Sequence, residues 1–212
     1  MNKMDLNKIY NESCIETMSR IDDKSIDLTM ADFPYGINEE YDIYLDTNES
    51  LISLINMAMP EILRISKVAF ITCGIANIFY YPKPTWIMCW VNSAGVGSTP
   101  WGFNCWQPIL VYGPDPYLKN GLGRIADMIQ TNEASDDNLH PCPKPLKFWS
   151  KLLHRGSINE GDLIYDPFMG SGTTAIVCNK YNRKWIGSEI SKTYCELTEK
   201  RMVPYLQQQK LF

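Results

Sequence analysis

The chain has 212 residues, a length that suits one domain with a full hydrophobic core. Its hydrophobic fraction of 45% and charged fraction of 21% are ordinary for a globular protein, which excludes a disordered or fibrous chain. The net charge of -4 excludes a strong attraction of the whole surface for a polyanion, so any such binding must depend on local basic patches.

Short apolar runs alternate with helical patterns along the chain, which is typical of an α/β domain with a largely parallel sheet. In chain order, the patterns predict strands over residues 8–10, 26–30, 68–72, 85–91, 108–112, 163–165 and 185–188. They predict helices over residues 50–64, 145–153, 173–181 and 192–207. Residues 92–105 and 113–143 are rich in glycine or polar residues, and both are predicted to be long loops that grip a large substrate.

A glycine turn follows the predicted strand 163–165, in the run Asp166-Pro167-Phe168-Met169-Gly170-Ser171-Gly172-Thr173-Thr174. Glycines at the carboxyl end of a parallel strand let the backbone approach a ligand closely, while the following helix presents free N–H groups. An acidic residue about 20 positions further on usually binds ribose hydroxyls, and Glu189 stands there. A phosphate-binding P-loop would need a lysine after the last glycine, where this chain has Thr173. The pattern therefore predicts a nucleotide-type site.

This turn, with the segment from Arg183 to Glu189, resembles the cofactor half of the beta-class amino-DNA methyltransferases. The run His140-Pro141-Cys142-Pro143-Lys144-Pro145 is similar to that family's His-Pro-x-x-Lys-Pro element, which helps hold the methionine end of the cofactor. The resemblance covers almost the whole chain and implies S-adenosylmethionine as cofactor, with S-adenosylhomocysteine as product. It also implies a Rossmann-like methyltransferase fold, in which a mostly parallel seven-stranded sheet carries helices on both faces and the motifs run in circularly permuted order.

The catalytic motif is expected at the end of the predicted strand 26–30, in the run Asp32-Phe33-Pro34-Tyr35, which resembles the family's Asp-Pro-Pro-Tyr. The amino group of adenine or cytosine is conjugated with its ring, so it is a poor nucleophile until hydrogen-bond acceptors draw it towards tetrahedral geometry. Asp32 supplies one acceptor and the carbonyl of Phe33 the second, with positioning and charge placement doing most of the catalysis. Tyr35 is expected to stack on a base swung out of the duplex.

Phe33 departs from the family's proline at this position. The carbonyl survives the change, but the fixed φ angle of proline is lost and a bulky ring is gained that could stack on the base or obstruct it. Upstream, Asn11 and Glu12 replace a Gly-Asp pair whose acid meets the cofactor's adenine in the family. The cofactor-binding residues implied by the resemblance are Glu12, Asp32, His140, Lys144, Pro145, Asp166, Pro167, Phe168, Gly170, Ser171, Gly172, Thr173, Thr174 and Glu189.

The sequence predicts one methyltransferase domain over residues 1–212. Its catalytic half spans about 1–112, a reduced target-recognition region about 113–139, and the cofactor half about 140–212. The resemblance implies DNA as the substrate, within a restriction-modification context, and Asp32 favours N6-adenine over N4-cytosine. The recognition region is small for reading bases in a groove, so relaxed specificity, a homodimer or an auxiliary specificity subunit is expected.

Parts of the sequence also fit two other functions. Pro141-Cys142 matches the nucleophile of a carbon-5 cytosine methyltransferase, but it lies inside the His-Pro element, and that reaction has no role for Asp32 to Tyr35. A catalytically impaired protein that still binds the cofactor, with Phe33 as the lesion, remains open. Seven cysteines without a Cys-x-x-Cys pair argue against a disulfide framework and a metal site, and the absence of a membrane span or signal core predicts a cytoplasmic protein.

Overall fold

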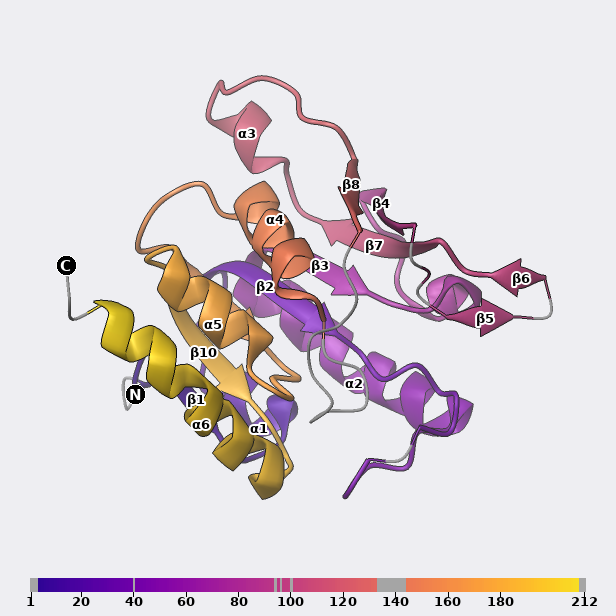
Figure 1. Cartoon of the computed structure of the whole chain (residues 1–212), viewed down its shortest axis with the longest axis horizontal. Coiled ribbons are helices and arrows are strands. Elements are labelled where there is room, and N and C mark those ends of the chain that lie inside the picture. Colours follow the sequence, from indigo (N-terminus) through magenta and orange to yellow (C-terminus); the bar gives the residue numbers. More distant parts are fainter. Residues whose placement is uncertain are drawn as a thin grey trace.

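A single large sheet organises the part of the chain that the computed structural model describes, which is residues 4–39, 41–93, 95, 97–99, 101–132 and 144–209. Within these residues the sheet has eight strands in the order β1-β10-β9-β2-β3-β7-β4-β8 (Figure 1). The strands are β1 (Lys8–Tyr10), β2 (Ile26–Asp32), β3 (Ser66–Thr72), β4 (Trp86–Asn92), β7 (Trp106–Tyr112), β8 (Met128–Thr131), β9 (Leu163–Asp166) and β10 (Lys184–Ser188). Only β7 runs antiparallel to its neighbours β3 and β4. The mostly parallel α/β sheet is therefore confirmed.

Seven helical segments accompany the sheet in the described residues. They are α1 (Cys14–Met18), α2 (Asn48–Ile65), the 3-10 helix η1 (Ile75–Tyr80), α3 (Pro116–Lys119), α4 (Leu146–Gly156), α5 (Thr173–Lys180) and α6 (Lys192–Gln209). The four helices predicted from the sequence all form, with ends shifted by a few residues. None of the described helices is both long and apolar enough to cross a membrane.

The sheet has one more strand than the seven predicted. β8 lies in the region expected to be a loop, and it pairs in parallel with β4 at the edge of the sheet. Its four residues alternate between exposed and buried, too short a pattern to stand out from a polar segment. Residues 92–105, also expected to be a loop, contain a small antiparallel hairpin of β5 (Ser98–Thr99) and β6 (Gly102–Phe103). Residues 133–143 lie outside the described part.

Helices cover both faces of the sheet, as predicted, and a separate hydrophobic cluster lies under each layer. Helix α2 lies on one side of the sheet and α4 and α5 on the other (Figure 1). In β3, Ala69 and Ile71 belong to the cluster under α1 and α2, whereas Val68 and Phe70 belong to the cluster under α4, α5 and α6. The alternation of side chains along a strand explains why one strand serves both clusters.

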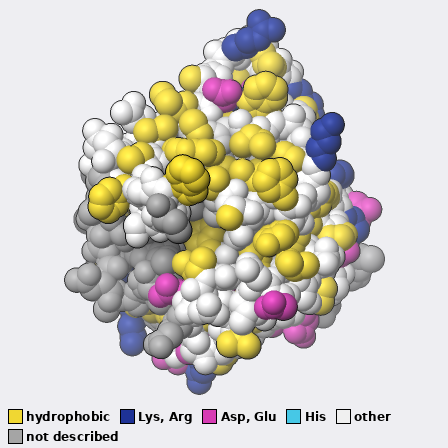
Figure 2. Space-filling model, turned by 90° about the vertical axis from the view of Figure 1, so that its right-hand side faces the viewer, with side chains coloured by type: hydrophobic (Ala, Val, Ile, Leu, Met, Phe, Trp, Pro, Cys, Tyr) yellow, Lys and Arg dark blue, Asp and Glu magenta, His cyan; other side chains and the backbone are white. Residues whose placement is uncertain are grey.

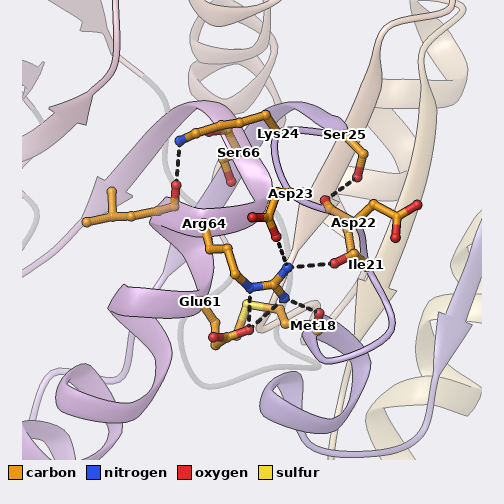
Figure 3. A network of polar contacts seen from close by, with 10 residues as sticks. Met18, Ile21, Asp22, Asp23, Lys24, Ser25, Glu61, Arg64 and Ser66 are labelled. Carbon is orange, nitrogen blue, oxygen red and sulfur yellow. Dashed lines mark hydrogen bonds and ion pairs between the residues drawn. The ribbon is translucent and has the colours of Figure 1, made fainter.

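Arg64 joins the end of α2 to the end of α1 and the turn into β2 (Figure 3). Its guanidinium donates to the carbonyls of Met18 and Ile21 at 2.8 and 2.9 Å and to the carboxylates of Asp23 and Glu61 at 2.6 to 3.0 Å. These contacts use all five N–H groups of the guanidinium. Arg64 thus fixes α1 against α2.

We expect Arg64→Lys to lower the free energy of unfolding by about 1–2 kcal/mol, because an ammonium reaches fewer of these acceptors and the network is partly exposed. Urea unfolding followed by circular dichroism measures the change, with Arg124→Lys on an exposed loop as the matched control. Equal stability of the two variants would contradict a role for the five-donor network.

Candidate active site

The site lies at the carboxyl ends of β2 and β9, which are adjacent and parallel in the sheet. From β9 the chain proceeds outward through β10, and from β2 it proceeds in the opposite direction through β3. Such a reversal leaves a crevice outside the strand ends, where open α/β sheets bind ligands. Asp32 ends β2 and Asp166 ends β9, so the two acids that the sequence singled out flank this crevice.

The glycine turn after β9 is closed by two acidic side chains. Asp166 accepts hydrogen bonds from the backbone N–H of Phe168 at 2.9 Å and from the hydroxyl of Thr174. Glu189, just after β10, accepts one from the N–H of Gly170 at 2.8 Å. Gly172, the residue just before α5, has a φ of +83°, and a Cβ there would lie 2.5 Å from the side chain of Thr198. Both conditions favour glycine at this position.

Burial raises the pKa of both acids that close the glycine turn, Asp166 and Glu189. Asp166 is 4% exposed, and burial, with smaller contributions from the charges of Asp32 and Glu189, raises its pKa to about 7. The hydrogen bonds from Thr174 and Phe168 oppose this rise in pKa. Burial also raises the pKa of Glu189, against the N–H groups of Ser191 and Gly170, which lower it. A ligand with positive charge would therefore stabilise the ionised form of Asp166.

The carboxylate of Asp32 is held by donors from three separate segments. One oxygen accepts from the hydroxyls of Tyr35 at 2.8 Å and Thr72 at 2.5 Å. The other oxygen lies 2.7 Å from the ammonium of Lys144, whose side chain is 10% exposed. Lys144 and Gln107 also donate to the Tyr35 hydroxyl at 2.9 and 2.5 Å. Burial and the Asp32 charge raise the pKa of Tyr35 well above its usual value, so the phenol keeps its proton.

Phe33 points into the core rather than across the entrance. Its ring is 1% exposed and packs edge-on against Tyr81 and Phe168, with centroids 5.4 and 4.6 Å away. The sequence left open whether this ring would stack on an entering base or obstruct it. In this structure the ring does neither, because it fills the space between two neighbouring aromatic rings.

The segment after Tyr35 is shaped by a buried acid, Asp46. Its carboxylate, 1% exposed, accepts hydrogen bonds from the N–H groups of Gly36, Ile37 and Glu39 at 2.7 to 3.2 Å. This contact ties residues 36–39 to Asp46, close to the start of α2. The segment thereby brings residues 41–44 to the crevice.

Two cavities meet in the crevice. The larger, of about 490 Å³, falls within the usual range for ligand pockets and is lined by predicted site residues Asp32, Phe33, Pro34, Tyr35, Pro167, Phe168, Gly170 and Glu189. The smaller, of about 40 Å³, is lined by Lys144, Asp166, Ser171, Thr173 and Thr174 together with Asp32, Phe168 and Gly170. Most of the residues that the sequence predicted for catalysis and cofactor binding therefore meet at one place.

Four predicted cofactor residues stand apart from these two cavities or outside the described part. Glu12 is engaged by Arg20 and by the hydroxyl of Thr17, and it lines neither cavity. Pro145 is the residue just before α4 and Gly172 the residue just before α5. His140 lies outside the described residues.

Sequence reasoning missed several residues of the site. The larger cavity is also lined by Ser13, Cys14, Ile15, Tyr41, Asp42, Ile43, Tyr44, Leu54, Met57, Ile190 and Tyr194. The Tyr44 hydroxyl is buried and has no hydrogen-bond partner in the described structure, which leaves it available to a ligand. The run Tyr41-Asp42-Ile43-Tyr44 could have been identified from the sequence, because it closely follows the catalytic motif. Thr72 gave no such signal, because only the pairing of β2 with β3 places it beside Asp32.

Comparison with known proteins agrees with this geometry. A family model described as DNA methylase, of the N6/N4 type, matches residues 125–200. The type II methyltransferase M.HpaI of Haemophilus parainfluenzae is 27% identical over 234 residues, which cover 92% of this chain and 74% of the relative.

Two solved structures share the fold. The PvuII DNA methyltransferase, described as cytosine-N4-specific, superposes with a TM-score of 0.71 at 15% identity, covering 92% of this chain and 85% of that one. The complex of M1.HpyAVI with S-adenosylmethionine superposes with a TM-score of 0.66 at 21% identity, covering 92% and 98%. The family model over residues 125–200, the relative and the shared fold together support a beta-class amino-DNA methyltransferase, and in this chain the catalytic motif precedes the cofactor motifs, as in that class.

Proposed function

We propose that this protein transfers a methyl group from S-adenosylmethionine to the exocyclic amino group of a DNA base, with N6-adenine as the favoured target. The observation that carries the proposal is the meeting of Asp32 and Tyr35 with the acid-closed glycine turn in one crevice. A protein that only binds the cofactor needs the acid-closed glycine turn, but it does not need Asp32 and Tyr35 beside it. The oriented carboxylate beside the cavity adds the acceptor that amino-group transfer requires.

The cavity residues fit the cofactor by their chemistry. Carboxylates of Asp32, Asp166 and Glu189 suit a ligand that carries an ammonium and a sulfonium charge, and Glu189 suits ribose hydroxyls. The unpartnered Tyr44 hydroxyl offers one further polar contact. Bound there, S-adenosylmethionine supplies an electrophilic methyl group, and one structural neighbour was solved in complex with it.

Asp32 and the carbonyl of Phe33 would accept hydrogen bonds from the target amino group. Each carboxylate oxygen accepts more than one hydrogen bond, so the oxygen that faces Lys144 can also take the amino group. With the cofactor bound, the amine nitrogen would form a bond to the methyl carbon as the carbon–sulfur bond breaks and its electron pair passes to sulfur. The surplus amine proton would leave by way of Asp32 to solvent. Tyr35 and Thr72 keep the carboxylate oriented throughout.

The preference for adenine rests on Asp32. In the amino-DNA methyltransferases that this chain resembles, an aspartate at this position is commoner in enzymes that methylate adenine, and a serine is commoner in those that methylate cytosine. N4-cytosine is the alternative target. Because the predicted recognition region 113–139 is short, we also propose relaxed sequence specificity or a second subunit that supplies the contacts to the sequence.

Transfer of tritiated methyl groups to mixed-sequence DNA tests the proposal, followed by mass spectrometry of the nucleosides. We expect N6-methyladenine; N4-methylcytosine would select the alternative target. Cofactor binding by calorimetry without any modified base would instead support the catalytically impaired protein.

Asp32→Asn should lower kcat by at least about 100-fold, the size of effect seen when one preorganised polar group is removed from an active site. Cofactor and DNA should still bind, because the cavity wall and the glycine turn are unchanged. Single-turnover methylation measures the loss, with the exposed Asp22→Asn as control. An Asp32→Asn enzyme with near-normal kcat would remove this carboxylate from the mechanism.

Cofactor binding should weaken as the pH falls below about 7, because Asp166 is then protonated and must release its proton to pair with a cationic ligand. One linked proton gives at most about a tenfold rise in Kd for each pH unit below that value. Calorimetry from pH 5.5 to 8.5 measures this slope. In Asp166→Asn the slope should vanish and the affinity at pH 8 should fall; a flat profile for the wild-type protein would contradict the linkage.

A further inference from the structure

Among the described residues, the hairpin of β5 and β6 carries two of the three most exposed aromatic side chains, the third being Phe79. Trp101 is 99% exposed and Phe103 is 85% exposed. The hairpin extends beyond the main sheet between β4 and β7 (Figure 1). Gly102, beside Trp101, has a φ of +117°, and no atom of the described residues lies within 4 Å of a Cβ placed on it. Two large aromatic side chains exposed together at one tip are typical of a binding surface.

The hairpin belongs to a long uncharged part of the sequence. From Thr85 to Pro114 the chain has no Asp, Glu, Lys or Arg. Figure 2 shows the face of the molecule on this side, where apolar side chains gather and only a few charged ones lie among them. A surface of this kind is suited to the flat, uncharged faces of bases rather than to phosphate groups.

The base of the hairpin reaches the active site. Trp106, at the start of β7, is 40% exposed, and its neighbour Gln107 donates to the Tyr35 hydroxyl at 2.5 Å. The N–H of Asn92, the last residue of β4, donates to the carbonyl of Cys105 at 2.9 Å. The hairpin therefore leaves the sheet at the same carboxyl edge that holds Asp32, and it is continuous with the catalytic motif.

We propose that this hairpin is a wedge for double-stranded DNA, in which Trp101 stacks between bases next to the target as the target base leaves the helix. The inference rests on the proposed function, since it assumes that a base must reach Asp32. A base inside a duplex cannot reach an enclosed site until it is unstacked, and an inserted aromatic ring compensates for the lost stacking.

A second copy of the chain fits the hairpin less well than DNA. A stable protein interface buries roughly 800 Å² on each partner, whereas one aromatic side chain buries about 150–250 Å². Trp101 and Phe103 together therefore fall short of such an interface. A base stack needs only one ring of this size.

The test compares duplex and heat-denatured mixed-sequence DNA as substrates for tritiated-methyl transfer. Trp101→Ala should lose about 5- to 150-fold in activity on duplex DNA, the ratio that corresponds to one lost base–aromatic stack. It should lose less than about threefold on single strands, where no base has to be unstacked from a duplex. Trp101→Phe should recover most of the duplex activity, and Trp86→Ala, at the opposite end of β4, is the matched control.

Three outcomes would overturn the wedge. These are unchanged duplex activity of Trp101→Ala, an equal loss on both DNA forms, and a fall in solution mass of Trp101→Ala, which would assign the hairpin to a second copy. A wild-type protein inactive on both DNA forms would overturn the proposed function and the wedge with it. Because Trp101 is fully exposed, thermal melting should be the same for both proteins.

Discussion

The parallel pairing of β2 with β9 is the constraint on which the rest of the site depends. Leu28 lies opposite Ile164 and Thr29 opposite Tyr165, so two segments more than 130 residues apart in sequence end at the same edge. This pairing alone brings the catalytic motif and the glycine turn to one crevice, whatever their order along the chain. The permuted order of the motifs therefore leaves the geometry of the site unchanged, because strand pairing in the sheet decides which residues lie beside Asp32.

The pairing also concentrates negative charge, and Lys144 is the cation that the described structure places against it. Burial is the main cause of the raised pKa of Asp166, and the nearby charges of Asp32 and Glu189 add to it. Lys144 contacts Asp32 and the Tyr35 hydroxyl, so a residue assigned from the sequence to the cofactor's methionine end is in this structure a partner of the catalytic motif. Lys144 lines the smaller cavity, which shares Asp32 with the larger one.

The sequence was sufficient for the parts of the fold whose signal is local. The apolar strands, the glycine turn and Glu189 each depend on a short run of residues, and all lie where that run predicts. β8 was missed because four residues of alternating polarity carry too little pattern. Thr72 and Gln107 were missed because they reach Asp32 and Tyr35 only through strand pairing, and the burial of Phe33 depends on Tyr81, which is distant in sequence.

The uncharged stretch from Thr85 to Pro114 bears on how the protein would respond to ionic strength. Proteins that neutralise DNA phosphates release bound counterions, and their affinity falls steeply as salt is added. Stacking by Trp101 releases no counterions. An acidic protein that binds the duplex partly through an uncharged hairpin would therefore lose affinity with salt only as steeply as its few basic contacts dictate. Its stacking contact with the bases next to the target would persist at salt concentrations where a protein bound mainly through phosphates dissociates.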